Sequence, residues 1–185
     1  MHAPTSSRKF KKAFMEQLLV SLQVAGLTSK TMGLQERRDA VRLSSDVAMA
    51  VARGRAAPWA RALVARHASE RRNEALLRRI LGGAGYESAA AAGRSRKIVR
   101  RSHGACRRKR IKSSVMAASS GSNGGAMVAR RMVKKRLQVL RKLVPGGEAL
   151  HGSFSLLSQV LDYVACLKTQ VELMQRLCKG SPAAA

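Results

Sequence analysis

The sequence predicts an all-α protein, and three observations support this fold class. Apolar residues make up 45% of the chain but aromatic residues only 3%, because Ala and Leu, both strong helix formers, dominate the apolar fraction. Apolar side chains recur every three or four residues in several segments, which is the helical period. Glycine and proline clusters separate these segments. No apolar stretch approaches the roughly 18 residues of a membrane-spanning helix, so no membrane association is predicted.

The charge of the chain is strongly unbalanced. It has 185 residues and a formal net charge of +26, from 36 Lys and Arg against 10 Asp and Glu. Such a charge favours polyanions, because each neutralised phosphate releases counterions. Cys106, Cys166 and Cys178 have no paired spacing, so neither a disulfide framework nor a zinc ribbon is predicted. These features indicate a basic, helical, intracellular protein.

The N-terminal half is predicted as a disordered tail over residues 1–7 and a helical region over residues 8–82. Its helices are expected over residues 8–25, 34–52 and 58–81. Gly26 ends the first helix, Pro58 is tolerated in the first turn of the third, and Gly82 ends that helix. With one Trp and two Phe, the core of this region would be thin. An organelle transit peptide is an alternative interpretation of its basic start.

A disordered linker is predicted over residues 83–125, rich first in Gly and Ala, then in basic residues, then in Ser and Gly. Between Arg94 and Lys112 it has ten Lys or Arg and no acidic residue. Such a block repels itself and does not fold alone. It is interpreted as a nuclear-localisation signal, with a phosphate-binding arm as the alternative. The nuclear-localisation candidates are Arg107, Arg108, Lys109 and Arg110.

Residues 126–180 have the most regular pattern, and residues 181–185 are predicted as a tail. Apolar side chains on the first helix of this segment have spacings of four, three and four, and Pro145 stops the helix. Ser153 or Ser155 is expected to cap the second helix. That helix has an apolar heptad seam at positions 157, 160, 164, 167, 171, 174 and 178.

A two-helix hairpin cannot bury so broad an apolar face against itself. Fully burying each Leu or Val contributes about 1.5–3 kcal/mol, so the face needs a partner. Another chain is the predicted partner, and packing onto residues 8–81 is the alternative. The predicted dimerisation residues are Val133, Leu137, Leu140, Leu143, Val144, Phe154, Leu157, Val160, Leu161, Val164, Leu167, Val171 and Met174.

The same segment resembles a known family. The run from Arg136 to Gly146, with its Leu-Val-Pro-Gly end, the later Phe-Ser-Leu-Leu at 154–157 and the Asp-Tyr-Val at 162–164 are similar to the plant basic helix-loop-helix proteins. The resemblance covers residues 126–180 alone. It implies that two chains pair as a parallel four-helix bundle, half of which this segment would supply, and that basic helix extensions enter the major groove.

The departures from that family concern DNA reading. The positions that correspond to the DNA-reading His, Glu and two Arg are Ser122, Ala126, Ala129 and Arg130. Only Arg130 matches, and Ala126 has no acceptor for the amino groups of the bases. Glycines at positions 121, 124 and 125 also weaken the helix that would have to continue. Specific E-box binding is therefore expected to be weak or absent.

A chain that pairs but does not read DNA is expected to be a nuclear transcriptional regulator. It would form heterodimers, or homodimers, with other helix-loop-helix proteins and block their E-box binding. The whole arrangement resembles a plant group that antagonises growth-promoting activators in brassinosteroid-controlled cell elongation, which implies a negative regulator of growth. The alternatives are a sequence-tolerant nucleic-acid-binding protein and a DNA-bound co-regulator. No catalytic residue, metal or cofactor is predicted, because the four His are scattered.

Overall fold

The computed structural model describes residues 5–26, 32–54, 56–107 and 124–180, and the side chains of residues 8–26, 32–54, 56–94 and 127–179. Within these residues every regular element is a helix, which confirms the predicted all-α class. The elements are α1 (Thr5–Ala25), α2 (Leu34–Arg53), α3 (Pro58–Ala68), η1 (Arg71–Asn73), α4 (Glu74–Arg107), α5 (Gly124–Leu143), η2 (Gly147–Ala149) and α6 (Ser153–Gly180).

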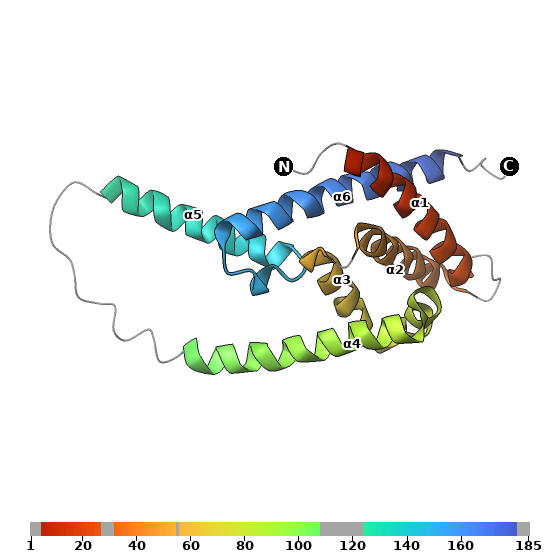
Figure 1. Ribbon diagram of the computed structural model, residues 1–185, viewed down its shortest axis with the longest axis horizontal. Helices are drawn as coiled ribbons and strands as arrows, with labels where there is room; N and C mark the ends of the chain where they lie inside the picture. The colour runs from red at the N-terminus through yellow and green to blue at the C-terminus, as the bar shows by residue number, and fades with distance from the viewer. Residues whose placement is uncertain (1–4, 27–31, 55, 108–123, 181–185) are drawn as a thin grey trace.

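The helices α2 and α3 lie between α4 on one side and α6 on the other (Figure 1). The larger cluster of buried side chains joins α1, α2 and α3 to α6 and to the end of α5, with Phe14, Trp59 and Leu173 among its members. A smaller cluster joins α2 and α3 to α4 through Val47 and Leu77. The N-terminal helices therefore do not form a thin core of their own, because α6 completes it.

The third predicted helix, over residues 58–81, is divided in the structure. It stops at Ala68, passes through η1 and resumes at Glu74 as α4. Polar side chains satisfy the interrupted backbone: the Ser69 hydroxyl donates to the Arg66 carbonyl at 2.7 Å, and the Asn73 amide donates to the His67 carbonyl at 3.3 Å. These local bonds compete with the helix ladder and explain the break.

The beginning of the predicted linker is helical instead. Gly82 has a φ of 73°, which makes a kink rather than an end, and α4 continues through the Ala-rich stretch to Arg107. Tyr86 and Ala90 are buried against α2 and α3. Arg78 bridges the kink through ion pairs with Glu74 at 3.0 Å and Glu87 at 2.6 Å. This stretch packs as a helix because the ring of Tyr86 supplies apolar area to bury. The Gly and Ala content on which the linker prediction rested does not take this ring into account.

The loop between α5 and α6 is tightly built. Gly146 has a φ of 76°, a left-handed conformation that glycine adopts without steric cost. A Cβ on Gly147 would lie 2.6 Å from the Arg141 carbonyl oxygen, so only glycine fits there. The predicted stop at Pro145 is therefore confirmed, and α6 begins at Ser153 with the Leu156 N–H donating to the Gly152 carbonyl at 3.0 Å.

None of the helices in the described part of the chain combines the length and apolar character needed to cross a bilayer.

Candidate interaction surface on α5 and α6

One face of α6 packs onto the N-terminal helices. Cys166 and Leu173, each 4% exposed, enter the larger core cluster. Leu156, near the start of the helix, is 0% exposed. Val160, Leu167 and Met174 are partly buried at its margin. The alternative in which this segment packs onto residues 8–81 is thus realised for one side of the helix.

Polar contacts fix this packing at its centre. The Asp162 carboxylate accepts hydrogen bonds from Arg53 Nε at 2.9 Å and from Trp59 Nε1 at 2.7 Å. Arg53 Nη2 lies 2.7 Å from Asp162 Oδ1. The ring of Trp59 also meets the ring of Tyr163, with centroids 5.0 Å apart. The hydrogen bond to Asp162 raises the pKa of the Arg53 guanidinium.

Further contacts lie along the C-terminal half of α6. Gln170 Nε2 donates to Asp46 Oδ1 at 3.0 Å and also contacts the Ser45 hydroxyl. The other Asp46 oxygen, Oδ2, lies 3.0 Å from His67 Nε2 on α3. Lys11 on α1 donates to Glu172 at 2.9 Å, and this hydrogen bond lowers the pKa of the Glu172 carboxyl. The helix is therefore held by α1, α2 and α3 together.

Burial on this face also changes the chemistry of Cys166. The pKa of the Cys166 thiol is raised to about 12, mainly because burial removes water from around the thiol. Burial likewise raises the pKa of the Tyr163 phenol. Cys166 is thus an unreactive apolar side chain, as expected of a buried cysteine, whereas Cys178 is exposed.

The opposite face of α6 is exposed and largely apolar. We call it the α6 strip, made of Leu157, Leu161, Val164, Lys168, Val171 and Gln175, whose spacings alternate between four and three. The exposed fractions of its apolar members are 42% for Leu157, 71% for Leu161, 41% for Val164 and 55% for Val171. Monomeric proteins seldom leave contiguous apolar surface of this kind without a partner.

The predicted dimerisation residues divide among these environments. Val144 is buried, and Leu137, Leu140, Val160, Leu167 and Met174 are partly buried. Exposed members are Val133, Leu143, Phe154, Leu157, Leu161, Val164 and Val171. The heptad seam derived from the sequence therefore lies along the border between the buried face of α6 and the α6 strip.

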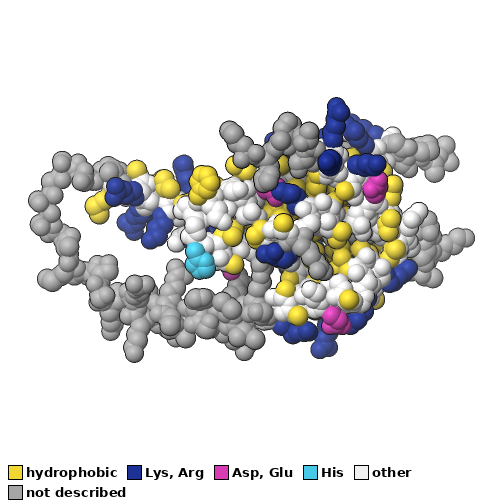
Figure 2. All heavy atoms as spheres, viewed as in Figure 1, with side chains coloured by type: hydrophobic (Ala, Val, Ile, Leu, Met, Phe, Trp, Pro, Cys, Tyr) yellow, Lys and Arg dark blue, Asp and Glu magenta, His cyan; other side chains and the backbone are white. Residues whose placement is uncertain are grey.

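The helix α5 carries a basic surface. Its cationic side chains are Arg130, Arg131, Lys134, Lys135, Arg136, Arg141 and Lys142, and it has no acidic residue. On the face shown in Figure 2, blue basic and yellow apolar side chains lie side by side over α5. Large apolar side chains such as Met127, Val128, Met132 and Val139 are at least half exposed here.

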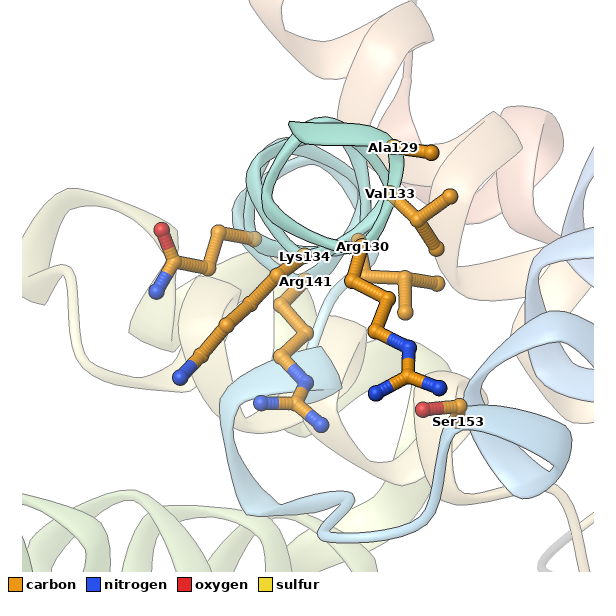
Figure 3. Close-up of a pocket in the computed structure, with 8 residues that line it drawn as sticks. Ala129, Arg130, Val133, Lys134, Arg141 and Ser153 are labelled. Atoms are coloured by element: carbon orange, nitrogen blue, oxygen red, sulfur yellow. The ribbon is translucent and has the colours of Figure 1, made fainter. Parts of the chain in front are cut away.

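A pocket of about 520 Å³ lies between α5 and the start of α6. Arg130, Lys134 and Arg141 line it together with Ser153, and no carboxylate does. Figure 3 shows that Arg130 reaches toward Ser153 and that Arg141 lies next to it, whereas Lys134 extends away from Ser153. Arg141 Nη2 also donates to the His151 carbonyl at 3.1 Å, which ties α5 to the loop. The pocket has the charge expected of an anion site.

The predicted DNA-reading and nuclear-localisation residues are only partly described. Ala129 and Arg130 are exposed and line the pocket. Ser122 and residues 108–110 lie outside the described residues, as do the side chains of Ala126 and Arg107. In the described part of the chain, no three His, Cys, Asp or Glu side chains gather in a group that could hold a metal ion.

Sequence reasoning missed the residues that attach α6 to the N-terminal helices. The sequence assigns no role to Arg53 and Gln170, places Trp59 only in the N-terminal core and includes Asp162 only in a motif. Asp162 is the one acidic residue in the first half of α6, between the apolar positions 161 and 164. A carboxylate among apolar positions needs a cationic partner if it is buried. This placement was the signal in the sequence that α6 packs against a basic residue elsewhere in the chain.

Comparison with known proteins identifies the family. A family description, IBH1-like, N-terminal domain, matches residues 7–71, which run from α1 through α3. A relative from Arabidopsis thaliana, named Transcription factor IBH1-like 1, is 36% identical over 180 residues that cover 97% of this chain and 97% of that protein. No solved structure matches the chain. By this nearly full-length similarity, the chain belongs to the IBH1-like family.

Proposed function

We propose that this protein is a transcriptional regulator that pairs with DNA-binding helix-loop-helix proteins through α5 and the α6 strip and blocks their E-box binding. The family supports the role in transcription, since the Arabidopsis thaliana relative is named a transcription factor. The observation that carries the pairing mechanism is the α6 strip, in which Leu161 is 71% exposed although the opposite face of the helix is already packed.

The α6 strip suits a partner helix. Its apolar members follow the spacing that fits knobs into holes on a facing helix, and α5 adds exposed apolar side chains beside it. Meanwhile the other face of α6 stays on α1–α3, so pairing through the strip leaves the core intact. The resemblance to the plant antagonists extends the proposal to the nucleus and to negative control of cell elongation.

Blocking follows from unequal DNA reading in the mixed dimer. Each half of an E-box requires its own recognition helix, and of the family's reading positions only Arg130 retains its residue. A mixed dimer therefore has one competent half and loses most of its specific affinity. Arg130 cannot replace the missing Glu, because a guanidinium has no acceptor for the amino groups of the bases.

The test is release of a labelled E-box duplex from a DNA-competent plant basic helix-loop-helix protein as the full chain is titrated in. The full chain is required, because a fragment starting at residue 126 would expose the buried face of α6. Release is expected with the native chain, and Leu161→Asp should weaken it at least tenfold, or about 1.4 kcal/mol. Ser158→Asp, an exposed position off the strip, makes the same charge change and should release normally.

If the native chain and Leu161→Asp released the E-box duplex equally, the proposal would be contradicted, because the net positive charge of the chain would then explain the release. A supershifted rather than released duplex would identify a DNA-bound co-regulator instead.

A second candidate function is sequence-tolerant nucleic-acid binding. The cationic pocket and the acid-free α5 favour it. This activity predicts a steep salt dependence, in which log K falls with log salt by about 0.9 per phosphate contact. Replacing both Arg130 and Lys134 by Gln should flatten that slope equally for E-box and scrambled duplexes.

A further inference from the structure

The α6 strip has a cation in the middle of its apolar surface. Lys168 lies between Val164 and Val171 on the same line along the helix, and it is exposed. Leu157 and Leu161 continue the strip toward the N-terminus of α6. A partner helix that covers the four apolar side chains must therefore also cover the stem of Lys168.

Lys168 has no partner within the described part of the chain, where its ammonium makes neither an ion pair nor a hydrogen bond. The acidic residue one turn further on, Glu172, is already engaged by Lys11 at 2.9 Å and by Arg176 at 2.8 Å. The strip itself contains no Asp or Glu. The charge of Lys168 is thus available to whatever helix covers the strip.

Covering an ammonium with apolar surface removes part of its hydration, which is unfavourable unless a carboxylate lies opposite. A second copy of this chain that pairs strip to strip offers none: in a parallel pair Lys168 would face Lys168, and in an antiparallel pair it would face other members of an acid-free strip. The basic side chains of α5 add to this repulsion. Polar residues placed within an apolar seam specify partner choice at some cost in affinity.

We propose that Lys168 is the residue by which the α6 strip selects its partner. It favours a helix that presents Asp or Glu opposite it and excludes a second copy of this chain. This inference rests on the proposed function, because it assumes that the strip is the pairing surface. It adds that the protein is monomeric alone and that its partners carry a carboxylate at the facing position.

The test uses the full chain and needs no identified partner. Sedimentation equilibrium would compare the native chain, Lys168→Leu, Lys168→Glu and an equimolar mixture of native chain with Lys168→Glu. The native chain should remain monomeric where Lys168→Leu dimerises. The mixture should associate at least tenfold more tightly than the native chain alone, a difference of about 1.4 kcal/mol.

Matched controls come from Lys12, an exposed lysine on α1 whose side chain is 81% accessible. Lys12→Leu should stay monomeric, and mixing native chain with Lys12→Glu should produce no association, although both change charge and apolar surface equally. Adding Leu161→Asp to Lys168→Leu should abolish the dimer, which locates the contact on the strip.

Dimerisation of the native chain as tight as that of Lys168→Leu would overturn the inference, as would a Lys168→Leu dimer that survives Leu161→Asp. So would equal association of the Lys168→Glu and Lys12→Glu mixtures. Failure of the proposed function looks different: Lys168→Leu would still dimerise through the strip, while the native chain would leave the E-box complex undisturbed.

Discussion

The indole Nε1 of Trp59 donates a hydrogen bond of 2.7 Å to Asp162, which joins α3 directly to α6. Trp59 is 1% exposed, so this N–H has no access to water as a substitute acceptor. The same carboxylate pairs with Arg53 from α2. One acidic side chain on α6 thus satisfies two donors from the N-terminal helices.

Replacing Asp162 by Ala should therefore destabilise the protein. It leaves the buried indole N–H unpaired and Arg53 without its carboxylate, and an unsatisfied buried donor costs about 1–3 kcal/mol. Urea unfolding followed by the fluorescence of the single Trp would measure the loss. Glu172→Gln, in an exposed pair on the same helix, should have a much smaller effect; equal losses would argue against the Asp162 contact as a main attachment.

Truncation to Ala should lower stability on one face of α6 and leave it almost unchanged on the other. Leu173→Ala removes a side chain that is 4% exposed in the core and should lower the free energy of unfolding by about 2–5 kcal/mol. Val171→Ala, two residues earlier and 55% exposed, should change it by no more than about 0.5 kcal/mol. Thermal unfolding of both variants decides this, and similar losses would mean that the strip is packed in solution.

Cysteine labelling should separate the same two environments. Cys166, buried and with its pKa raised to about 12, holds little thiolate at pH 8 and should react with maleimide at least tenfold more slowly than the exposed Cys178. Mass spectrometry of the labelled peptides would give both rates. Rapid labelling of Cys166 in the native chain would show that α6 leaves the N-terminal helices readily.

The same thiol predicts a pH dependence of stability. The folded state keeps the Cys166 proton up to a pKa of about 12, whereas the unfolded chain releases it near the ordinary cysteine pKa of about 8.5. The stabilisation is complete below the lower value and is lost as pH rises toward the higher one. Between pH 8.5 and 12, the free energy of unfolding of the native chain should therefore fall more steeply than that of Cys166→Ala. Identical pH profiles of unfolding would contradict this assignment.

Glycine substitutions should test the loop before α6. Gly147→Ala places a Cβ 2.6 Å from the Arg141 carbonyl oxygen, a backbone atom that cannot rotate away, and should cost about 1–3 kcal/mol. Gly83→Ala meets nothing within 4 Å and should raise stability by up to about 1 kcal/mol, because Ala is the better helix former. Chemical denaturation of both variants would reveal the opposite signs, and a neutral Gly147→Ala would show that the loop relaxes.

Helix positions were predictable where the apolar periodicity agreed with the Gly and Pro residues that start or end helices. The end of α1 near Gly26, the start of α3 at Pro58 and the stop at Pro145 all follow from local residue chemistry. The break after Ala68 did not, because Ser69 and Asn73 interrupt the helix through side-chain bonds that hydrophobic periodicity does not record. Gly82 was interpreted as an end, yet Tyr86 beyond it packs onto α2.

The direction that α6 faces was the least predictable feature. Its apolar residues cover two faces of the helix. The helical spacing of these residues does not show which face packs onto the N-terminal helices and which stays exposed. The choice is made by pairs far apart in sequence, Asp162 with Arg53 and Gln170 with Asp46. Such pairs become visible only when α2 and α6 are brought together.

The attachment of α6 to α1–α3 also bears on how members of this family can exchange segments. If the chain were divided between α4 and α5, each half would present a bare apolar face that the other half covers. A chimera that joins the N-terminal half of one relative to the C-terminal half of another should be less stable unless both parents supply matching groups at positions 53, 59 and 162. Segments on the two sides of this junction are therefore exchanged most safely together with the residues at these three positions.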